Sequence, residues 1–119
     1  MTPVTIFRGE IWIFALDPIV GSEQAKMRPC VIVQRDSANA ASPTTIVCPL
    51  TAAGKDRGNL LNVLLRAPEG GTRKDSLVLC NQARTVDRQR IRGPKLGNVS
   101  DATMALINEG LRAILDLGE

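Results

Sequence analysis

The segment EIWIFALDPIVGSEQAKMRPCVIVQ, residues 10–34, contains two apolar runs of strand length separated by a polar stretch. The first run is EIWIFAL (10–16) and the second is CVIVQ (30–34). Both are rich in the β-branched or aromatic residues that favour strands. The polar stretch is a loop of roughly 12 residues, which is long for a small protein and is usually functional. The segment therefore predicts two strands joined by a functional loop.

Further short runs follow at close spacing between turn signals, and they are apolar up to residue 80 and more polar beyond it. We expect strands over 44–50, 59–66, 76–80, 81–87 and 90–96. The connections are too short for crossover helices, so antiparallel pairing is expected. Five or six such strands close most naturally into a small, strongly bent sheet or barrel. The length of 119 residues suits one domain, which we place at residues 1–119.

The last twenty residues change to a helical period. Ser100 is a good N-cap, and Asp101 favours the positive end of a helix. Gly118 is a plausible stop. Five apolar residues are expected on one face of this helix: Met104, Ile107, Leu111, Ile114 and Leu115. The fold class is thus mainly β with a C-terminal α-helix.

The composition narrows the possible functions. The chain contains no histidine, which excludes imidazole bases, Ser-His or Cys-His nucleophile pairs and His-ligated metals. The net charge is +3, but residues 101–119 carry −3, so residues 1–100 carry +6. This asymmetry is a modest indication of a polyanionic partner, although solvated surface charge is the commoner explanation.

No apolar run approaches the roughly 20 residues that cross a bilayer, and the N-terminus lacks the pattern of a secretion signal. We therefore expect no membrane contact and a cytoplasmic location. Cys30, Cys48 and Cys80 lie in apolar stretches without a CxxC spacing. They are interpreted as buried free thiols rather than as a disulfide framework or a zinc site.

Polar side chains gather at three places where apolar strands end, a pattern typical of sites on a rigid sheet. These are Glu23-Gln24 through Arg28-Pro29, then Thr51 after Pro49-Leu50, and Ser76 through Gln82. Pro29 lacks a donor for the ladder, so we expect it at the first position of a strand, with Arg28 held extended before it. The alternative for Arg28 is a surface ion pair with Glu23 or Asp17.

Three motifs make the chain resemble the MazF/PemK (also Kid) family of toxin endoribonucleases over residues 9–117. They are GEIWIFALDPIVGSEQAKMRPCVIV (9–33), IVCPLT (46–51) and SLVLCNQARTVDRQRI (76–91). The resemblance implies a dimeric SH3-like barrel of the PemK/CcdB type. It also implies selective, metal-independent cleavage of single-stranded RNA without a cofactor, leaving a 2′,3′-cyclic phosphate and a 5′-hydroxyl.

The resemblance also implies roles for individual residues. The catalytic arginine that precedes a proline corresponds to Arg28, and the threonine at a strand end corresponds to Thr51. The acidic residue and the substrate-contacting glutamine correspond to Glu23 and Gln24. Four further residues are expected to bind substrate: Ser76, Gln82, Lys26 and Arg84. For Gln24, Gln82 and Ser76 a purely structural role stays open, and Arg84 could instead lie on a dimer or solvated surface.

The chemistry divides between these groups. A guanidinium grips two phosphate oxygens in a planar fork, so Arg28 suits stabilisation of the phosphorane and protonation of the leaving oxygen. Because arginine is a poor proton acceptor, we assign the 2′ proton to Glu23 or to a water that it holds. The competing role for Glu23 is to order its loop through a hydrogen bond or salt bridge.

Partners and alternative functions follow from the same resemblance. The family pairs with an antitoxin whose acidic C-terminal segment wraps the toxin, so a cognate MazE-like antitoxin is expected. The first alternative function is a non-catalytic toxin of the same fold that inhibits a protein target such as DNA gyrase. The second is a nucleic-acid module without chemistry, because a fold does not determine a function.

Overall fold

The computed structural model describes residues 4–55 and 62–118 except 17–25. Within these residues a curled antiparallel sheet follows the order β4-β5-β3-β2-β1-β7, and β6 pairs with β3 beside this path. The strands are β1 (Glu10–Ala15), β2 (Met27–Ile32), β3 (Thr44–Ala52), β4 (Val63–Leu65), β5 (Ser76–Val78), β6 (Arg84–Asp87) and β7 (Gly97–Asn98). The α-helices are α1 (Asp36–Ala41) and α2 (Asp101–Ile114). The 3₁₀ turns are η1 (Ala53–Lys55), η2 (Glu69–Gly71), η3 (Cys80–Gln82) and η4 (Arg88–Arg90).

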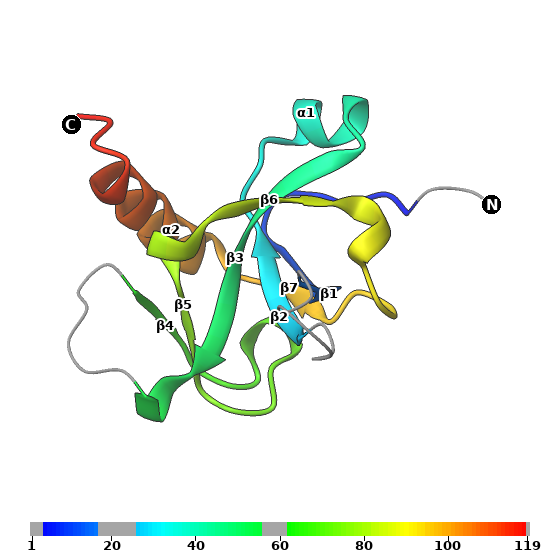
Figure 1. Ribbon diagram of the computed structural model, residues 1–119. Coiled ribbons are helices and arrows are strands. Elements are labelled where there is room, and N and C mark those ends of the chain that lie inside the picture. Colours follow the sequence, from blue (N-terminus) through cyan, green and yellow to red (C-terminus); the bar gives the residue numbers. More distant parts are fainter. Residues whose placement is uncertain (1–3, 17–25, 56–61, 119) are drawn as a thin grey trace, which may run out of the picture.

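Strand β3 organises the sheet, because it pairs with three other strands. One edge pairs with β2, and the other pairs with β6 along its first half and with β5 along its second half. Figure 1 shows β3 running through the centre of the molecule, with α1 near its start and α2 to one side. The predicted fold class, a small bent antiparallel sheet with a C-terminal helix, is confirmed.

Apolar side chains fill both faces of the sheet, because successive residues of a strand point to opposite sides. One core lies between the sheet and α2 and includes Ile11, Val31, Cys48 and Ile107. The other core lies on the opposite face and includes Trp12, Phe14, Cys30, Ile32, Val47 and Val86. Phe14 and Trp12 are therefore core residues. This second face also continues beyond the core to the start of β2, where Arg28 lies.

The N-terminus of α2 is confirmed at the predicted residue. The Ser100 side chain accepts a hydrogen bond of 3.1 Å from the Thr103 N–H. Ile107 is fully buried, and Met104 and Leu111 pack against the same core. The helix ends at Ile114, and near this end Ile114 and Leu115 are 41% and 58% exposed.

Two strand predictions need correction. The predicted strand over 90–96 is instead η4, an isolated bridge from Ile91 to Phe14, and the two-residue strand β7. Strand β2 begins at Met27, so Pro29 is its third residue rather than its first. Proline fits there because β2 pairs with β3 only from Cys30 onward.

The sequence analysis did not predict α1, a six-residue helix that is too short to be stable alone. Tertiary contacts hold it. Its buried Asn39 accepts hydrogen bonds from Gln34 and Thr45 and donates one to the Gln34 carbonyl. The Arg88 guanidinium adds a bond of 2.8 Å to the Asn39 carbonyl.

Gly97 lies where two backbones approach closely. A Cβ at this position would stand 2.6 Å from the carbonyl carbon of Gly70. The approach brings η2 against β7, and the Glu69 carboxylate then accepts a hydrogen bond of 2.8 Å from the Ser100 N–H. A glycine at position 97 therefore allows η2 to pack against β7, and the hydrogen bond from Ser100 to Glu69 then links η2 to the start of α2.

All three cysteines are buried free thiols, as predicted. Within the described part of the chain, no helix has both the length and the apolar character needed to cross a bilayer.

Candidate active site

The register of β2 and β3 relates the positions of Arg28 and Thr51. Cys30 pairs with Pro49, and Val31 pairs with Cys48. The ladder ends at the pair Cys30–Pro49, and its register, if extended by two residues, would set Arg28 opposite Thr51. Side chains directly opposite in an antiparallel pair share one face of the sheet. Two residues separated by 22 others in the sequence thus come to the same face at one end of the sheet.

The Arg28 guanidinium is available for a ligand. Arg28 is half-buried, and its side chain makes no hydrogen bond or ion pair with any described residue. Asp17 and Glu23, the ion-pair partners considered from sequence, lie outside the described residues. Phe14 is the cross-strand partner of Arg28 in β1 and is fully buried. The arginine therefore has a rigid aromatic neighbour and an uncommitted charge.

Two positive charges at this site affect the pKa of the Cys30 thiol. Burial raises the pKa of this thiol to about 12, while the positive charges of Arg28 and Arg84 act in the opposite direction. Both guanidinium groups therefore lie within electrostatic range of one buried sulfur. Arg84 of β6 pairs with Val47 of β3. Its side chain therefore lies on the same face of the sheet as that of Arg28. The structure thus brings two of the predicted site arginines together.

The remaining predicted residues divide into three groups. Lys26 is exposed directly before β2, and its carbonyl accepts a hydrogen bond of 2.8 Å from the Leu16 N–H. Gln82 is exposed in η3, two residues before Arg84. Glu23 and Gln24 lie outside the described residues.

Ser76 belongs to the same end of the sheet but to its other face. It pairs with Ala52 of β3 and Leu65 of β4, and Leu65 belongs to the core under α2. Its hydroxyl donates a hydrogen bond of 3.0 Å to the Lys74 carbonyl. The geometry therefore assigns Ser76 to the shape of the turn before β5 rather than to the face of Arg28.

Arg90 is a residue at this site that the sequence analysis did not single out. Its Nη1 donates a hydrogen bond of 3.1 Å to the carbonyl of Ala15, the last residue of β1. Ala15 pairs with Met27, next to Arg28. No local pattern indicates this contact, because it joins residues 75 positions apart in the sequence.

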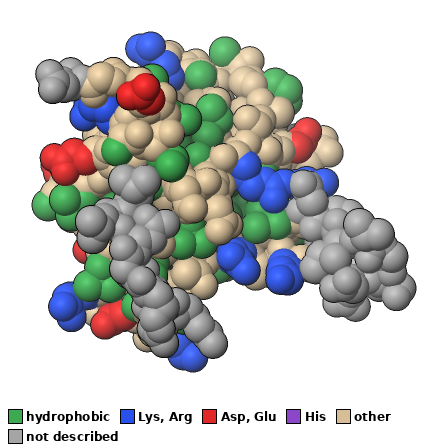
Figure 2. Space-filling model, turned by 60° about the vertical axis from the view of Figure 1, so that its left-hand side comes forward, with side chains coloured by type: hydrophobic (Ala, Val, Ile, Leu, Met, Phe, Trp, Pro, Cys, Tyr) green, Lys and Arg blue, Asp and Glu red, His purple; other side chains and the backbone are tan. Residues whose placement is uncertain are grey.

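Lys and Arg side chains gather around a partly apolar area on the face of the molecule shown in Figure 2, and Asp and Glu side chains lie toward its periphery. This distribution agrees with the excess positive charge of residues 1–100. Among the described residues, no group of three or more Cys, Asp or Glu side chains is arranged to hold a metal ion. The arrangement therefore suits an anionic ligand bound by guanidinium, hydroxyl and backbone groups.

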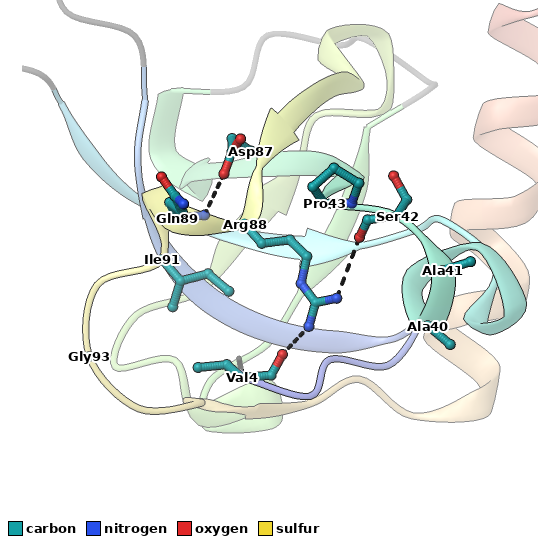
Figure 3. Close-up of a pocket in the computed structure, with 10 residues that line it drawn as sticks. All are labelled: Val4, Ala40, Ala41, Ser42, Pro43, Asp87, Arg88, Gln89, Ile91 and Gly93. Carbon is teal, nitrogen blue, oxygen red and sulfur yellow. Dashed lines mark hydrogen bonds between the residues drawn. The ribbon is translucent and has the colours of Figure 1, made fainter. Parts of the chain in front are cut away.

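A separate pocket of about 760 Å³ lies beside α1 and η4. Figure 3 shows Arg88 crossing this pocket toward backbone carbonyls. Its guanidinium donates to the carbonyls of Ser42 and Val4 as well as to that of Asn39. With its donors committed to the protein, Arg88 ties α1 and the N-terminal segment to η4. The candidate active site is the end of the sheet with Arg28 and Thr51.

The structure is thus a curled antiparallel sheet with a helix on one face and the Arg28 side chain on the other. A family profile described as "PemK-like, MazF-like toxin of type II toxin-antitoxin system" matches residues 7–115. Endoribonuclease EndoA of Bacillus subtilis is 36% identical over 110 residues, which cover 92% of this chain and 94% of that protein. The chain belongs to the PemK/MazF family.

Two solved structures share the fold. Mycobacterium tuberculosis toxin MazF-mt6 superposes with a TM-score of 0.77 at 24% identity, covering 92% of this chain and 99% of its own. A mycobacterial endoribonuclease in complex with its cognate antitoxin gives a TM-score of 0.72 at 20% identity, covering 97% of both chains. The structures agree in fold, while the family profile and the 36% identical endoribonuclease confirm the predicted family and enzyme class, an endoribonuclease toxin.

Proposed function

We propose that this protein is a sequence-specific toxin that cleaves single-stranded RNA by attack of a ribose 2′-oxygen on the adjacent phosphorus. The products are a 2′,3′-cyclic phosphate and a 5′-hydroxyl, and no metal ion takes part. The observation that supports the proposal is the register of β2 and β3, which runs from the pair Cys30–Pro49 toward Arg28 and Thr51, together with an Arg28 side chain that has no partner among the described residues.

The reaction needs three contributions from the protein. The 2′-hydroxyl must lose a proton, the negative charge of the phosphorane must be stabilised, and the departing 5′-oxygen must gain a proton. Positioning and fixed charge supply most of the catalysis in phosphoryl chemistry. Arg28 supplies the fixed charge, because its planar fork donates to two oxygens of one phosphate. Thr51 donates a further hydrogen bond to the same oxygens.

The proton transfers use the loop before β2. We assign the 2′ proton to Glu23 or to a water that it holds, since an arginine stays protonated at neutral pH. Arg28 then donates toward the departing 5′-oxygen. A pH–rate profile compares the wild type with Glu23→Gln. We expect the variant to lose the acidic limb of the profile, and an unchanged acidic limb would remove Glu23 from the mechanism.

Substrate recognition relies on polar loop groups and phosphate contacts. Lys26, Gln24, Gln82 and Arg84 are the proposed contacts, and Ser76 supports the adjacent turn. Phosphate contacts release counterions, so RNA affinity should fall as salt rises. The exact bases recognised are then read by mapping the cleavage ends on a long RNA.

The deciding experiment uses an RNA oligonucleotide ladder with a single 2′-deoxy position. The purified protein should cut the all-ribose strand and should fail only where the attacking ribose lacks its 2′-oxygen. Excess EDTA should leave the rate unchanged. A requirement for added magnesium would reject the proposed chemistry. Absence of cleavage together with inhibition of DNA gyrase would favour the non-catalytic alternative.

We further propose that the protein acts as a homodimer and is neutralised by a cognate MazE-like antitoxin. The net charge of +3 and the calculated pI of about 9.1 favour an acidic binding segment. The structural relative described above is an endoribonuclease with its cognate antitoxin. Light scattering after size-exclusion chromatography measures the dimer, and titration with the antitoxin should abolish cleavage at a stoichiometric ratio.

A further inference from the structure

The outer edge of β1, the edge turned away from β2, carries a regular series of carbonyl acceptors. In an antiparallel sheet, the backbone groups of alternate residues point to the same neighbour. The first three carbonyls on this edge accept hydrogen bonds from backbone N–H groups: Gly9 from Val99 at 2.9 Å, Ile11 from Leu96 at 2.8 Å and Ile13 from Arg92 at 2.8 Å. The fourth carbonyl of the series is that of Ala15, the last residue of β1.

A side chain binds the Ala15 carbonyl. Because Ile13 accepts from the N–H of Arg92, the donor to Ala15 in a continued ladder would be the N–H of Arg90. Arg90 is instead the last residue of the turn η4, and its guanidinium Nη1 donates to the Ala15 carbonyl at 3.1 Å. The Arg90 side chain thus completes the series at the point where the chain turns away from β1.

Arg28 is held by this same end of β1. Arg28 pairs with Phe14, and two residues further on the Leu16 N–H donates a bond of 2.8 Å to the Lys26 carbonyl. Hydrogen-bonded pairs recur at every second residue of an antiparallel ladder, so Phe14 and Arg28 form such a pair as well. On the other side of β2, the ladder with β3 ends at Cys30. Among the described residues, β1 is therefore the strand that pairs with Arg28.

The end of β1 thus lies between Arg90 on its outer edge and β2 on its inner edge. Arg90 is half-buried, and a charged donor in such a place makes a stronger hydrogen bond than a neutral donor in water. Without this bond the end of β1 would open more readily, as weakly held strand ends do. Arg28 would then move with its partner strand, and a displacement of about 1 Å from the productive position can cost about 10²-fold in rate.

We propose that Arg90 is a positioning residue for RNA cleavage. Its guanidinium fixes the end of β1 and, through the paired strand β2, holds Arg28 where the phosphate binds. This inference rests on the proposed RNA cleavage and adds to it a residue that acts through Arg28 rather than on the substrate.

The first test removes the donor and then restores it. Arg90→Met keeps the length of the side chain without a donor, and single-turnover cleavage at saturating protein should become about tenfold slower. Affinity is measured with an RNA that carries a 2′-deoxy group at the attacking position, and it should stay within about threefold of the wild type. Arg90→Lys keeps a charged donor and should recover most of the rate. Equal rates for the two variants, or a loss confined to affinity, would overturn the proposal.

Arg92→Met is the matched control, because it removes the same charge two residues away. The Arg92 side chain is exposed and donates to the carbonyls of Gln89 and Ile91 in its own segment. Its backbone N–H, which bonds to β1, is unchanged by the substitution. The cleavage rate should stay within about twofold of the wild type. A loss equal to that of Arg90→Met would assign the effect to charge rather than to the bond with Ala15, and would overturn the proposal.

The second test asks whether Arg90 acts through Arg28. In the Arg28→Ala background, Arg90→Met should cause no further loss of cleavage rate, because the side chain that it positions is already absent. Urea unfolding should show the same change in stability for Arg90→Met in both backgrounds, so a purely structural role would not remove its effect on the rate. Rate losses that multiply would mean that Arg90 acts independently of Arg28, and would overturn the proposal.

Backbone hydrogen exchange measures the positioning without any cleavage. In Arg90→Met the amides of Arg28 and Leu16 should exchange about tenfold faster than in the wild type. The Val33 amide, which donates to a carbonyl of β3, should keep its wild-type rate. Arg92→Met should alter none of the three amides. Unchanged exchange at Arg28 in Arg90→Met would overturn the proposal even if cleavage became slower.

These outcomes separate the positioning role from the nuclease activity. If the wild type cuts no RNA, the proposed reaction fails, and faster exchange at Arg28 in Arg90→Met still shows that Arg90 holds this residue. If RNA is cut while exchange and rate are unaffected by Arg90→Met, the reaction stands and the positioning role is rejected.

Discussion

Polar side chains at the two ends of β3 differ in whether they have hydrogen-bond partners inside the protein. At the first end, Thr45 is fully buried and its hydroxyl donates a bond of 2.7 Å to the Asn39 side chain. Gln34 donates to the same oxygen, and the Arg88 guanidinium donates to the Asn39 carbonyl. At the other end, neither the Thr51 hydroxyl nor the Arg28 guanidinium has a partner among the described residues.

The difference separates structural from functional polarity. A buried polar group that finds its partners inside the protein stabilises the fold, and losing one partner leaves the other unsatisfied. A half-buried guanidinium without an internal partner contributes little to folding and keeps its donors for a ligand. Mutations at the first end should therefore reduce stability and spare the reaction, while mutations at the second end should do the reverse.

The largest expected effect is that of Arg28→Ala. We expect the single-turnover cleavage rate to fall about 10³-fold, equivalent to about 4 kcal/mol, because one charged donor to the phosphorane is lost. The free energy of unfolding should change by less than about 0.5 kcal/mol. Arg35→Ala is the control, since Arg35 is an exposed arginine at the start of α1. A rate loss of similar size in the control would break the comparison.

Asn39→Ala tests the opposite end. We expect the free energy of unfolding in urea to fall by about 3 kcal/mol, because the side chains of Thr45 and Gln34 both lose their acceptor. The cleavage rate per folded molecule should stay within twofold of the wild type. A rate loss without a stability loss would mean that this end takes part in the reaction.

Thr51→Ala should have the next largest effect, a loss of about 10²-fold in cleavage rate from removal of one neutral donor. Thr51→Ser keeps the hydroxyl and should recover most of the rate, whereas Thr51→Val keeps the shape and should not. Equal rates for the serine and valine variants would show that the hydroxyl is not used. Stability of all three variants is compared in the same urea titrations.

We expect the smallest effect for replacement of Glu69. This carboxylate has hydrogen-bond partners inside the protein but is partly exposed, so it is intermediate between the two ends of β3. Burial raises its pKa, but hydrogen bonds from the Ser100 backbone and from the Thr103 and Ser100 side chains outweigh burial, and the pKa lies below its ordinary value. The carboxylate therefore contributes stability above its unfolded pKa, and that contribution is lost as pH falls through the lowered folded value.

The measurement is the difference in unfolding free energy between wild type and Glu69→Gln, followed from pH 7 down to pH 3. At pH 7 the wild type should be more stable by a few tenths of a kcal/mol, since the charge is screened by solvent. The difference should shrink on acidification below about pH 4.5. A difference that grows toward low pH would contradict the direction of the shift.

Local patterns predicted the elements that local forces form. Short apolar runs indicated the strands around Trp12, Val31 and Val47, and Ser100 indicated the start of α2, where its side chain accepts the expected bond. Local patterns were misleading where distant contacts decide. The run RIRGPKL (90–96) was predicted as a strand, but the structure has the end of η4, one bridge from Ile91 to Phe14 and then β7 there.

The candidate site divides along the same line. The motif before Pro29 and the threonine after Pro49 could be recognised from sequence, because each lies at the end of an apolar run. That Ser76 faces the other side of the sheet could not be seen, because a strand's face depends on its partners' register. Nor could the contact of Arg90 with the end of β1, which joins distant parts of the chain.

By itself, the sequence determined the succession of strands, the final helix, the excess of positive charge and the residue types available for chemistry. These follow from side-chain periodicity and from composition, which act over a few neighbouring residues. Only the tertiary structure decided that the register of β2 and β3 runs toward Arg28 and Thr51 and that Ser76 lies on the other face of the sheet. The reason is that strand register is set by long-range pairing and by burial of both faces, and a shift of one residue would reverse every side chain.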